Sequence, residues 1–468
     1  MTHRFVRTVI AALIAVTTGT PAGAQQAPKT PIADVYRTAS NRIIAAALAD
    51  SSAWNRLAEL TDKFGHRLSG SASLERAIDW IVAEMKKDQL SNVRGERVMV
   101  PKWVRGEEWA RLVSPRAAPL HMIGLGGSVA TPARGITAEV LVVNDFDELT
   151  RHAAEAKGKI VLFDVPFTSY GQTVRYRGRG ASAAAKVGAV ASLIRSVSSA
   201  TMQNPHTGAM GYDSTVAKIP AAALSTEDAA MLHRMSSRGE KVIVTLKMSA
   251  QKHPDAPSRN VVADLVGSEK PNEIVVLGGH IDSWDVGQGA MDDAGGVVAA
   301  WEAVKLLKRL DLRPRRTIRV VAWTNEENGG RGSAGYRDAH RSEIEKHVMA
   351  LESDNGVFKP HGIGITAGEG GLAMAADIAT LLAPIGADSA TVGGGGADTG
   401  PIGALGVPTM SPNVDGTRYF WYHHSSADTM DKLDPREMAE CVALMAVVAY
   451  VVADMRQTLP RTPQRQAQ

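Results

Sequence analysis

The sequence contains one cysteine, Cys441, among 468 residues. A single cysteine cannot form an intramolecular disulfide, and it excludes a metal site that is built from several thiolates. Cys441 lies in residues 438–452, an apolar stretch with helical spacing, so we expect it to be buried in the core.

Strong net charge and long apolar runs are also missing. The formal net charge is +3, and no dominant block of lysine and arginine occurs, so nothing in the sequence indicates nucleic-acid binding. The apolar run at residues 9–16 is shorter than the roughly 20 residues that span a bilayer.

The N-terminus has the three parts of a secretory signal peptide. Basic Arg4 and Arg7 precede the short apolar run, and small residues follow at 22–24. We predict that residues 1–24 are cleaved, which makes the protein secreted or periplasmic and leaves no membrane contact. The alternative, a membrane anchor, is disfavoured by the length of the run.

The chain after residue 24 divides into segments that differ in their hydrophobic pattern and composition. Residues 25–100 contain helical apolar spacing and form the N-terminal part of the predicted catalytic domain. Residues 101–255 contain short β-rich runs between Gly-, Ser- and Pro-rich loops, without clustered His, Asp or Glu, which predicts an inserted domain without catalytic groups. Residues 256–457 alternate strands with helices, and the polar residues 458–468 are predicted to be a disordered tail.

The alternation after residue 256 predicts the fold class, an α/β fold. We expect strands at 261–266, 274–277, 317–323 and 348–352, and helices at 293–310, 372–382 and 435–452. Such a pattern is typical of a mixed, largely parallel sheet flanked by helices. In these sheets the active site lies beyond the carboxyl ends of the strands.

Potential metal ligands follow these strands in five short segments. Two histidines and three carboxylates, one of them bridging, could hold two adjacent divalent cations. The candidate ligands are His280, Asp292, Glu327, Asp354 and His424. Each residue alone also fits an ordinary loop or helix-cap position, and it is the set of five in order that predicts a metal site. Nitrogen and oxygen ligands suit Zn²⁺, with Co²⁺ or Mn²⁺ as alternatives.

Neighbouring residues suggest supporting roles. Glu326 lies beside a ligand, where a free carboxylate could take a proton from a metal-bound water. Asp282 and Asp428 are near enough in sequence to orient His280 and His424. Asp292 is assigned the bridge because Asp293 is nearer the start of the following helix, which it could cap.

Longer strings in the sequence resemble a known family, the di-zinc exopeptidases that include secreted aminopeptidases and glutamate carboxypeptidases. The likeness covers nearly all of the mature chain and is greatest to the plasma glutamate carboxypeptidase (carboxypeptidase Q) branch. It rests on Phe-Gly-His-Arg-Leu-Ser-Gly-Ser at 64–71, Val-Pro-Lys-Trp-Val-Arg-Gly at 100–106, Gly-Gly-His-Ile-Asp-Ser-Trp-Asp at 278–285, Gly-Gly-Gly-Gly-Ala-Asp at 393–398 and Tyr-Phe-Trp-Tyr-His-His at 419–424.

The resemblance implies a role for each candidate. His280 and Asp354 would bind one zinc, Glu327 and His424 the other, and Asp292 both. Glu326 would be the general base, and Asp282 would orient His280. The insert resembles a protease-associated domain, which borders or covers the cleft in such enzymes, and a homodimer is implied as well.

One position departs from the family pattern. In prostate-type glutamate carboxypeptidase a tyrosine directly precedes the last histidine ligand, whereas here His423 holds that place. Either His423 or Tyr422 could take over stabilisation of the oxyanion. The loop at 393–400 and the aromatic stretch at 419–422 are predicted to border the substrate pocket, with Gly395, Gly396 and Tyr422 as the substrate contacts.

We therefore expect a di-zinc exopeptidase that hydrolyses a terminal peptide bond of short peptides through a metal-bound hydroxide, as a dipeptidase or carboxypeptidase. A di-zinc aminopeptidase is the alternative, because both activities need the same metals. A non-catalytic, receptor-like relative is a further alternative, although it predicts lost ligands and none is lost.

Overall fold

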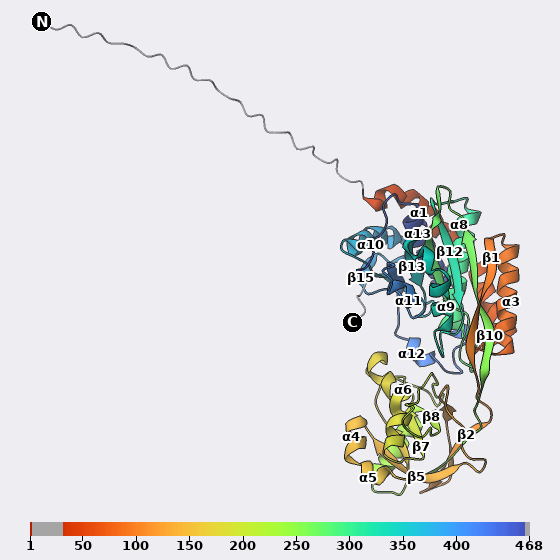
Figure 1. Cartoon of the computed structure of the whole chain (residues 1–468), viewed down its shortest axis with the longest axis vertical. Helices are drawn as coiled ribbons and strands as arrows, with labels where there is room; N and C mark the ends of the chain where they lie inside the picture. Colours follow the sequence, from red (N-terminus) through yellow and green to blue (C-terminus); the bar gives the residue numbers. More distant parts are fainter. Residues whose placement is uncertain (2–30, 464–468) are drawn as a thin grey trace.

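The computed structural model describes Met1 and residues 31–463. The predicted signal peptide, apart from Met1, lies outside the described residues. Two lobes are visible in Figure 1, and each is built on a sheet of eight strands.

The larger lobe contains a mixed sheet with the order β1-β10-β12-β11-β13-β16-β14-β15. Four neighbouring strands in its middle, β12, β11, β13 and β16, are parallel, and β1 and β10 pair antiparallel at one edge. The strands are β1 (Ser91–Val104), β10 (Gln251–Leu265), β11 (Lys270–His280), β12 (Arg316–Trp323), β13 (His347–Glu352), β14 (Pro360–Thr366), β15 (Ser389–Val392) and β16 (Thr409–Val414).

Helices cover both faces of this sheet, as the sequence predicted. Val275 and Leu277 of β11 pack in one core cluster with α1, α8 and α13, whereas Ile274 and Val276 pack in a second cluster with Tyr336 of α9. Alternate residues of a strand point to opposite faces, so β11 is buried on both sides. The helices of this lobe are α1 (Ile32–Leu48), α2 (Ser52–Phe64), α3 (Ala72–Lys87), η1 (Ala290–Ala294), α8 (Gly295–Arg309), α9 (Arg331–Ala339), η2 (Arg341–Lys346), α10 (Gly371–Ala379), η3 (Thr380–Ile385), α11 (Gly400–Gly403), α12 (Tyr419–Tyr422), η4 (Met430–Lys432) and α13 (Pro435–Asp454).

The last long helix shows how the sequence specifies these elements. Asp434 precedes α13 and accepts hydrogen bonds from the backbone of Arg436 and Glu437, while Pro435 occupies the first helical position. Cys441 is fully buried within α13, which confirms the expectation for the single cysteine.

The smaller lobe contains a second sheet, with the order β3-β2-β9-β5-β6-β7-β8-β4. Its strands confirm the short β-rich runs predicted for the insert, but helices cover this sheet too, and these were not predicted. The elements are β2 (Glu108–Ser114), β3 (Ala118–Leu120), β4 (Met122–Gly124), β5 (Ile136–Val143), α4 (Phe146–Arg151), α5 (Ala153–Ala156), β6 (Ile160–Phe163), α6 (Tyr170–Lys186), β7 (Ala191–Arg195), β8 (Ala221–Leu224), α7 (Thr226–Ser237) and β9 (Ile243–Met248).

A two-stranded ribbon joins the lobes. Strands β1 and β10 pair from Ser91↔Asp264 to Val104↔Gln251, so the chain enters and leaves the smaller lobe on adjacent strands. Helix α12 of the larger lobe lies between the two lobes in Figure 1. The smaller lobe is thus an insertion at the end of a long hairpin.

The C-terminal segment differs from its prediction. Leu459 is buried, and the guanidinium of Arg461 donates hydrogen bonds to the carbonyls of Ile344, His347 and Leu405. The prediction of disorder is therefore wrong for residues 458–463, because one apolar and one basic side chain attach them to the larger lobe.

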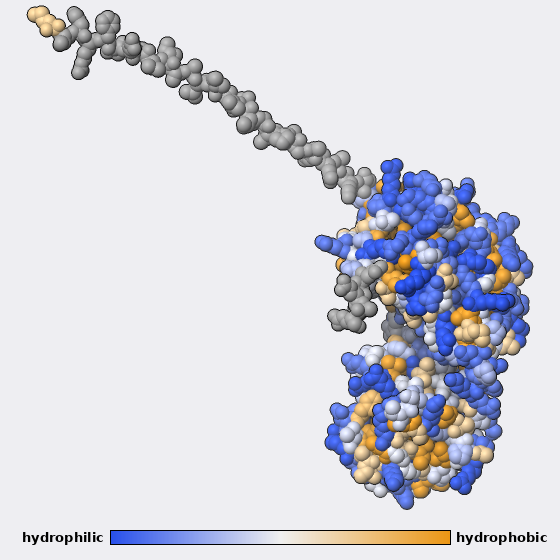
Figure 2. Space-filling view, viewed as in Figure 1, coloured by the Kyte–Doolittle hydropathy of each residue, from blue (hydrophilic) through white to orange (hydrophobic). Residues whose placement is uncertain are grey.

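The surface is predominantly polar. Figure 2 shows hydrophilic residues over most of the larger lobe and a greater share of hydrophobic residues on the smaller lobe. None of the helices within the described residues has the length and apolar character that crossing a bilayer requires.

Candidate metal centre

The candidate ligands meet at one edge of the larger sheet. His280 is the last residue of β11 and pairs with Trp323, the last residue of β12. Glu327 and Asp354 follow shortly after the ends of β12 and β13. Because these strands are parallel, their carboxyl ends bring the three side chains to the same place, as the sequence predicted.

Asp292 belongs to two groups of side chains that could each hold a metal ion, one with His280 and Asp354 and the other with His423 and His424. On one side, His280 Nε2 is 3.2 Å from Asp292 Oδ1 and 3.4 Å from Asp354 Oδ1. On the other side, His424 Nε2 is 3.3 Å from Asp292 Oδ2 and 2.9 Å from Glu327 Oε2. The structure thus brings all five candidate ligands together, with the two oxygens of Asp292 directed to different groups.

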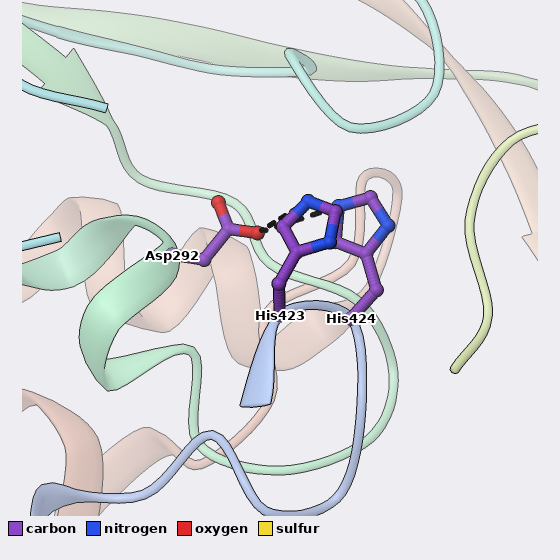
Figure 3. A group of neighbouring side chains, drawn as sticks. All are labelled: Asp292, His423 and His424. Atoms are coloured by element: carbon purple, nitrogen blue, oxygen red, sulfur yellow. Dashed lines mark ion pairs between the residues drawn. The ribbon is translucent and has the colours of Figure 1, made fainter. Parts of the chain in front are cut away.

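His423 belongs to the same cluster, although the sequence analysis chose His424 as the ligand. The two rings are stacked with centroids 3.5 Å apart, and Figure 3 shows both facing Asp292. His423 Nε2 is 3.6 Å from Asp292 Oδ2, yet only His424 also pairs with Glu327. Burial, followed by the neighbouring His424, holds the pKa of His423 well below its ordinary value.

The cluster has the polar atoms that a metal would satisfy. His280 Nε2, Asp292 Oδ2 and Glu327 Oε1 are buried and have no hydrogen-bond partner among the described residues. Buried polar groups are normally paired, so these atoms fit a bound cation. The donors are imidazole nitrogens and carboxylate oxygens, which is the set that zinc and similar divalent metals accept.

The ionisable groups of the cluster shift one another's pKa values. Burial would raise the pKa of Asp292, but the imidazoles of His280 and His424 beside its carboxylate hold that pKa well below the ordinary value. Burial, together with the charges of Asp354 and Glu327, raises the pKa of Glu326 well above its ordinary value. Glu326 also lines the cavity beside the cluster, where a proton acceptor would face substrate.

Asp282 has a different contact from the predicted one. The ring atom His280 Nδ1 lies 2.8 Å from the backbone carbonyl of Asp282, whereas the carboxylate Oδ1 is 3.8 Å away. That carboxylate accepts hydrogen bonds from Ser69 Oγ and from the backbone of Glu326 and Glu327. Asp282 therefore orients His280 through its main chain, and its side chain fixes the turn that carries the two glutamates.

Asp428 also differs from its predicted role. Its carboxylate accepts hydrogen bonds from the backbone of Ala290, Met291 and Asp292, at 3.0, 2.8 and 3.2 Å. The ring atom His424 Nδ1 instead lies 3.3 Å from Nη1 of Arg177. Asp428 thus holds the loop that presents Asp292, and it does not orient His424.

Asp293 lies behind the cluster, at the start of α8. Its Oδ1 accepts from the backbone of Gly296 in the first turn, and its Oδ2 accepts from the backbone of His280. This agrees with the sequence-based separation of Asp293, near the helix start, from Asp292. One carboxylate ties α8 to the end of β11.

A cavity of about 270 Å³ opens onto the cluster. Side chains from both lobes line it. Tyr170 and Arg177 of α6 and Asn355 of the larger lobe were not foreseen, whereas Tyr419 and Phe420 of α12 belong to the aromatic stretch that was expected there. The insert was predicted to lack catalytic groups, and two of its side chains nevertheless line the cavity. The Gly- and Arg-rich sequence of α6 contains no pattern that would have revealed this.

The predicted pocket residues Gly395, Gly396 and Tyr422 do not line this cavity. A Cβ atom on Gly396 would collide with the carboxyl group of Glu352, so the glycine packs against a buried side chain. Tyr422 packs partly buried against the main core cluster. Of the aromatic stretch, Tyr419 and Phe420 face the cavity instead, because they lie one helical turn before the histidines.

Comparison with known proteins identifies the family. Residues 260–449 match the pattern of Peptidase family M28. Carboxypeptidase Q of Xenopus laevis is 48% identical over 429 residues, which cover 91% of this chain and 92% of that protein. The chain belongs to peptidase family M28. The match spans every candidate ligand of this M28 peptidase.

Solved structures agree with this assignment. A peptidase M28 precursor from Shewanella amazonensis superposes with a TM-score of 0.89 at 36% identity, covering 92% of this chain and 99% of that one. A zinc aminopeptidase from Bacillus subtilis superposes with a TM-score of 0.65 at 21% identity, over 86% of this chain and 95% of that one. The second likeness shows that this M28 peptidase shares the fold of that enzyme.

Proposed function

We propose that this M28 peptidase is a two-zinc exopeptidase that removes a terminal residue from short peptides. The observation that carries the proposal is the position of Asp292, with one carboxylate oxygen facing each of two groups of nitrogen and oxygen donors. One shared carboxylate between two such groups is the arrangement of a two-metal hydrolytic site.

His280 and Asp354 would hold one ion, His424 and Glu327 the other, and Asp292 both; Co²⁺ or Mn²⁺ would suit the same donors. When bound, the two ions supply Lewis-acid activation of the scissile carbonyl and lower the pKa of the attacking water. Stacked against His424, His423 helps to define the wall of the site.

Glu326 is the residue that moves the proton. It is not needed as a ligand in either group, and its side chain reaches the cavity. A free carboxylate at this place can take a proton from the attacking water and give it to the leaving amine nitrogen.

The size of the cavity favours short substrates. A volume of about 270 Å³ lies just below the roughly 300–1,000 Å³ of drug-sized ligand sites, and α6 of the smaller lobe forms one wall. Similarity to carboxypeptidase Q supports a dipeptidase or carboxypeptidase, and the fold shared with a zinc aminopeptidase keeps that activity as the second candidate.

Four further features belong to this proposal. The leader at 1–24 supports a secreted or periplasmic enzyme, with domain boundaries at residues 100, 255 and 457. The smaller lobe contributes side chains to the wall of the cavity, which supports its interpretation as a protease-associated domain. Likeness to carboxypeptidase Q supports a homodimer. The presence of all five candidate ligands at one site weighs against a non-catalytic relative.

The test of the proposal is Glu326→Gln. The variant removes the proton acceptor and keeps the size of the side chain, so zinc content should remain near two per chain while kcat falls by about 100-fold or more. Metal analysis and dipeptide hydrolysis measure the two quantities. Near-normal turnover with two bound ions would overturn the assignment of Glu326.

A further inference from the structure

The backbone of one candidate metal ligand, His424, is held by the smaller lobe. His424 has a φ of 59°, in the left-handed region that is unfavourable for a residue with a side chain. Its carbonyl oxygen accepts a hydrogen bond of 2.9 Å from the backbone N–H of Thr207, which lies in the loop between β7 and β8. A strained conformation persists only where its surroundings hold it, so this contact between the lobes helps to keep His424 in place.

An asparagine of the same loop holds the two residues that follow His424. Asn204 Nδ2 donates to Ser425 Oγ at 3.0 Å, and Asn204 Oδ1 accepts from Ser426 Oγ at 2.7 Å. The hydroxyl of Ser425 in turn donates to the carbonyl of Tyr422 at 2.8 Å, across the two histidines. Asn204 thus uses both a donor and an acceptor on consecutive residues, and it fixes the turn that carries His424.

The imidazole ring of His424 also depends on how the lobes pack. Its ring packs against the buried indole of Trp284, with centroids 5.6 Å apart. A Cβ atom on Gly126 of the smaller lobe would lie only 2.0 Å from that indole, so the backbone of the smaller lobe is in close contact with Trp284. The smaller lobe therefore supports His424 both through its backbone and through the residue behind its ring.

The supporting loop is itself firmly attached to the smaller lobe. Thr207 Oγ1 donates to the carbonyl of Gly124 at the end of β4, at 2.7 Å, and the backbone N–H of Gly126 donates to the carbonyl of Gly208 at 2.9 Å. A loop that is bonded to its own sheet and to the histidine turn can fix the position of one relative to the other.

The other group of ligands lacks this support. His280 Nδ1 faces the carbonyl of Asp282, and the backbone N–H of His280 donates to Asp293; both partners belong to the larger lobe. Among the described residues, neither His280 nor Asp354 forms a hydrogen bond with the smaller lobe. The two groups of ligands therefore differ in what holds them.

We propose that Asn204, in the loop that also contains Thr207, is a positioning residue for His424 and so sets the zinc affinity of one of the two groups of ligands. The group of His424 and Glu327 binds zinc tightly only while the lobes are in contact, whereas the group of His280 and Asp354 depends on the larger lobe alone. The inference rests on the proposed two-zinc function and deepens it, because it makes the insert a support of the metal centre.

The experiment introduces Asn204→Ala into two backgrounds that each keep one group of ligands intact. Glu327→Gln weakens the group of His424, and Asp354→Asn weakens the group of His280. Each protein is stripped of metal and titrated with zinc against a chromophoric chelator. We expect Asn204→Ala to lower the affinity of the remaining zinc by about 10-fold in the Asp354→Asn background, as for other residues that orient ligands, and to leave it unchanged in the Glu327→Gln background.

A control variant and a kinetic measurement separate positioning from general destabilisation. Asn144→Ala is the matched control, because Asn144 is an exposed asparagine of the smaller lobe whose side chain bonds only Glu148 of that lobe; zinc affinity should be unchanged in both backgrounds. In otherwise wild-type enzyme, Asn204→Ala should lower dipeptide turnover at limiting free zinc and regain the wild-type kcat when zinc is raised about 10-fold. KM should stay the same, because Asn204 does not line the cavity.

The outcomes are distinct. An equal loss of zinc affinity in both backgrounds, or no loss in either, overturns the inference and leaves the exopeptidase intact. A similar loss in Asn144→Ala, or a kcat of Asn204→Ala that added zinc does not restore, does the same. A wild-type enzyme that binds fewer than two zinc ions, or that cleaves no unblocked peptide with two ions bound, overturns the proposed function itself.

Discussion

Asp293 supports His280 from behind, with Oδ2 accepting a hydrogen bond of 3.0 Å from the backbone N–H of His280. The contact fixes the end of β11, which carries His280, relative to the start of α8, and Asp292 lies directly before α8 in η1. The positions of the candidate ligands His280 and Asp292 thus depend on the buried carboxylate of Asp293, which is not itself a ligand.

Gly279→Ala tests this support. A Cβ atom at residue 279 would collide with Asp293 Oδ2 and with the backbone of α8. We expect zinc affinity to fall by about 10–100-fold, as for other residues that orient ligands. A competition titration against a zinc chelator measures the affinity. Gly400→Ala is the control, because nothing lies within 4 Å of a Cβ atom there; equal zinc affinity in the two variants would contradict the idea.

Metal removal should lower thermal stability. Asp292, Glu327 and Asp354 are held close together, and bound cations offset the repulsion among their charges. Free zinc at 100 times its Kd stabilises the folded state by about 2.7 kcal/mol. The entropy of unfolding is about 2.1 cal/mol/K per residue, so in a chain of 468 residues each kcal/mol moves Tm by roughly 1 °C.

Differential scanning calorimetry with and without a chelator gives that shift. In an Asp354→Asn variant the shift should be smaller, because one ligand of the first group is weakened. A Tm that does not respond to the chelator in the wild-type enzyme would contradict a metal centre.

Stability should fall as pH is lowered because His347 is buried in a neutral form. Its ring contacts the hydroxyl of Tyr336 at 3.0 Å, and burial lowers its pKa to about 4 from an ordinary value near 6.5. Below pH 6.5 the unfolded chain binds a proton that the folded chain does not. The contribution of His347 to the free energy of unfolding is therefore complete above about pH 6.5 and is lost as pH falls toward 4.

Comparison with His347→Gln isolates this residue. Between pH 7 and pH 5 the free energy of unfolding of the wild type should fall by about 2 kcal/mol more than that of the variant. Urea unfolding of metal-free protein measures it. His361→Gln changes an exposed histidine and should follow the wild type; parallel curves for wild type and His347→Gln would refute the prediction.

Removal of the C-terminal segment should destabilise the larger lobe. Truncation after residue 457 deletes buried Leu459 and the three hydrogen bonds from Arg461 to backbone carbonyls. We expect a loss of about 3 kcal/mol, from one buried leucine and the hydrogen bonds. Truncation after residue 463 is the matched control and should leave Tm unchanged.

Three of the metal ligands could be predicted from the sequence because each follows a recognisable strand. The end of a buried, β-branched run fixes where His280, Glu327 and Asp354 lie, and parallel pairing then brings them together. Asp292 and His424 do not follow strands directly. Their prediction depended on the set of five residues with the correct chemistry.

The cavity wall could not be predicted in the same way. Arg177 reaches His424 across 247 positions of sequence, and its place depends on how the two lobes pack. The partners of Asp282 and Asp428 were missed for a related reason. Closeness in sequence suggested ligand orientation, whereas buried backbone N–H groups elsewhere in the loops needed acceptors and took these carboxylates.

The ribbon of β1 and β10 has an evolutionary consequence. Two antiparallel strands can be closed by a turn of two residues, so a whole lobe can replace that turn without shifting any strand of the larger sheet. Mutations in α6 can then reshape the wall that faces the substrate while every metal ligand stays on the other lobe. Substrate preference and the hydrolytic apparatus are thereby free to diversify as separate inherited modules.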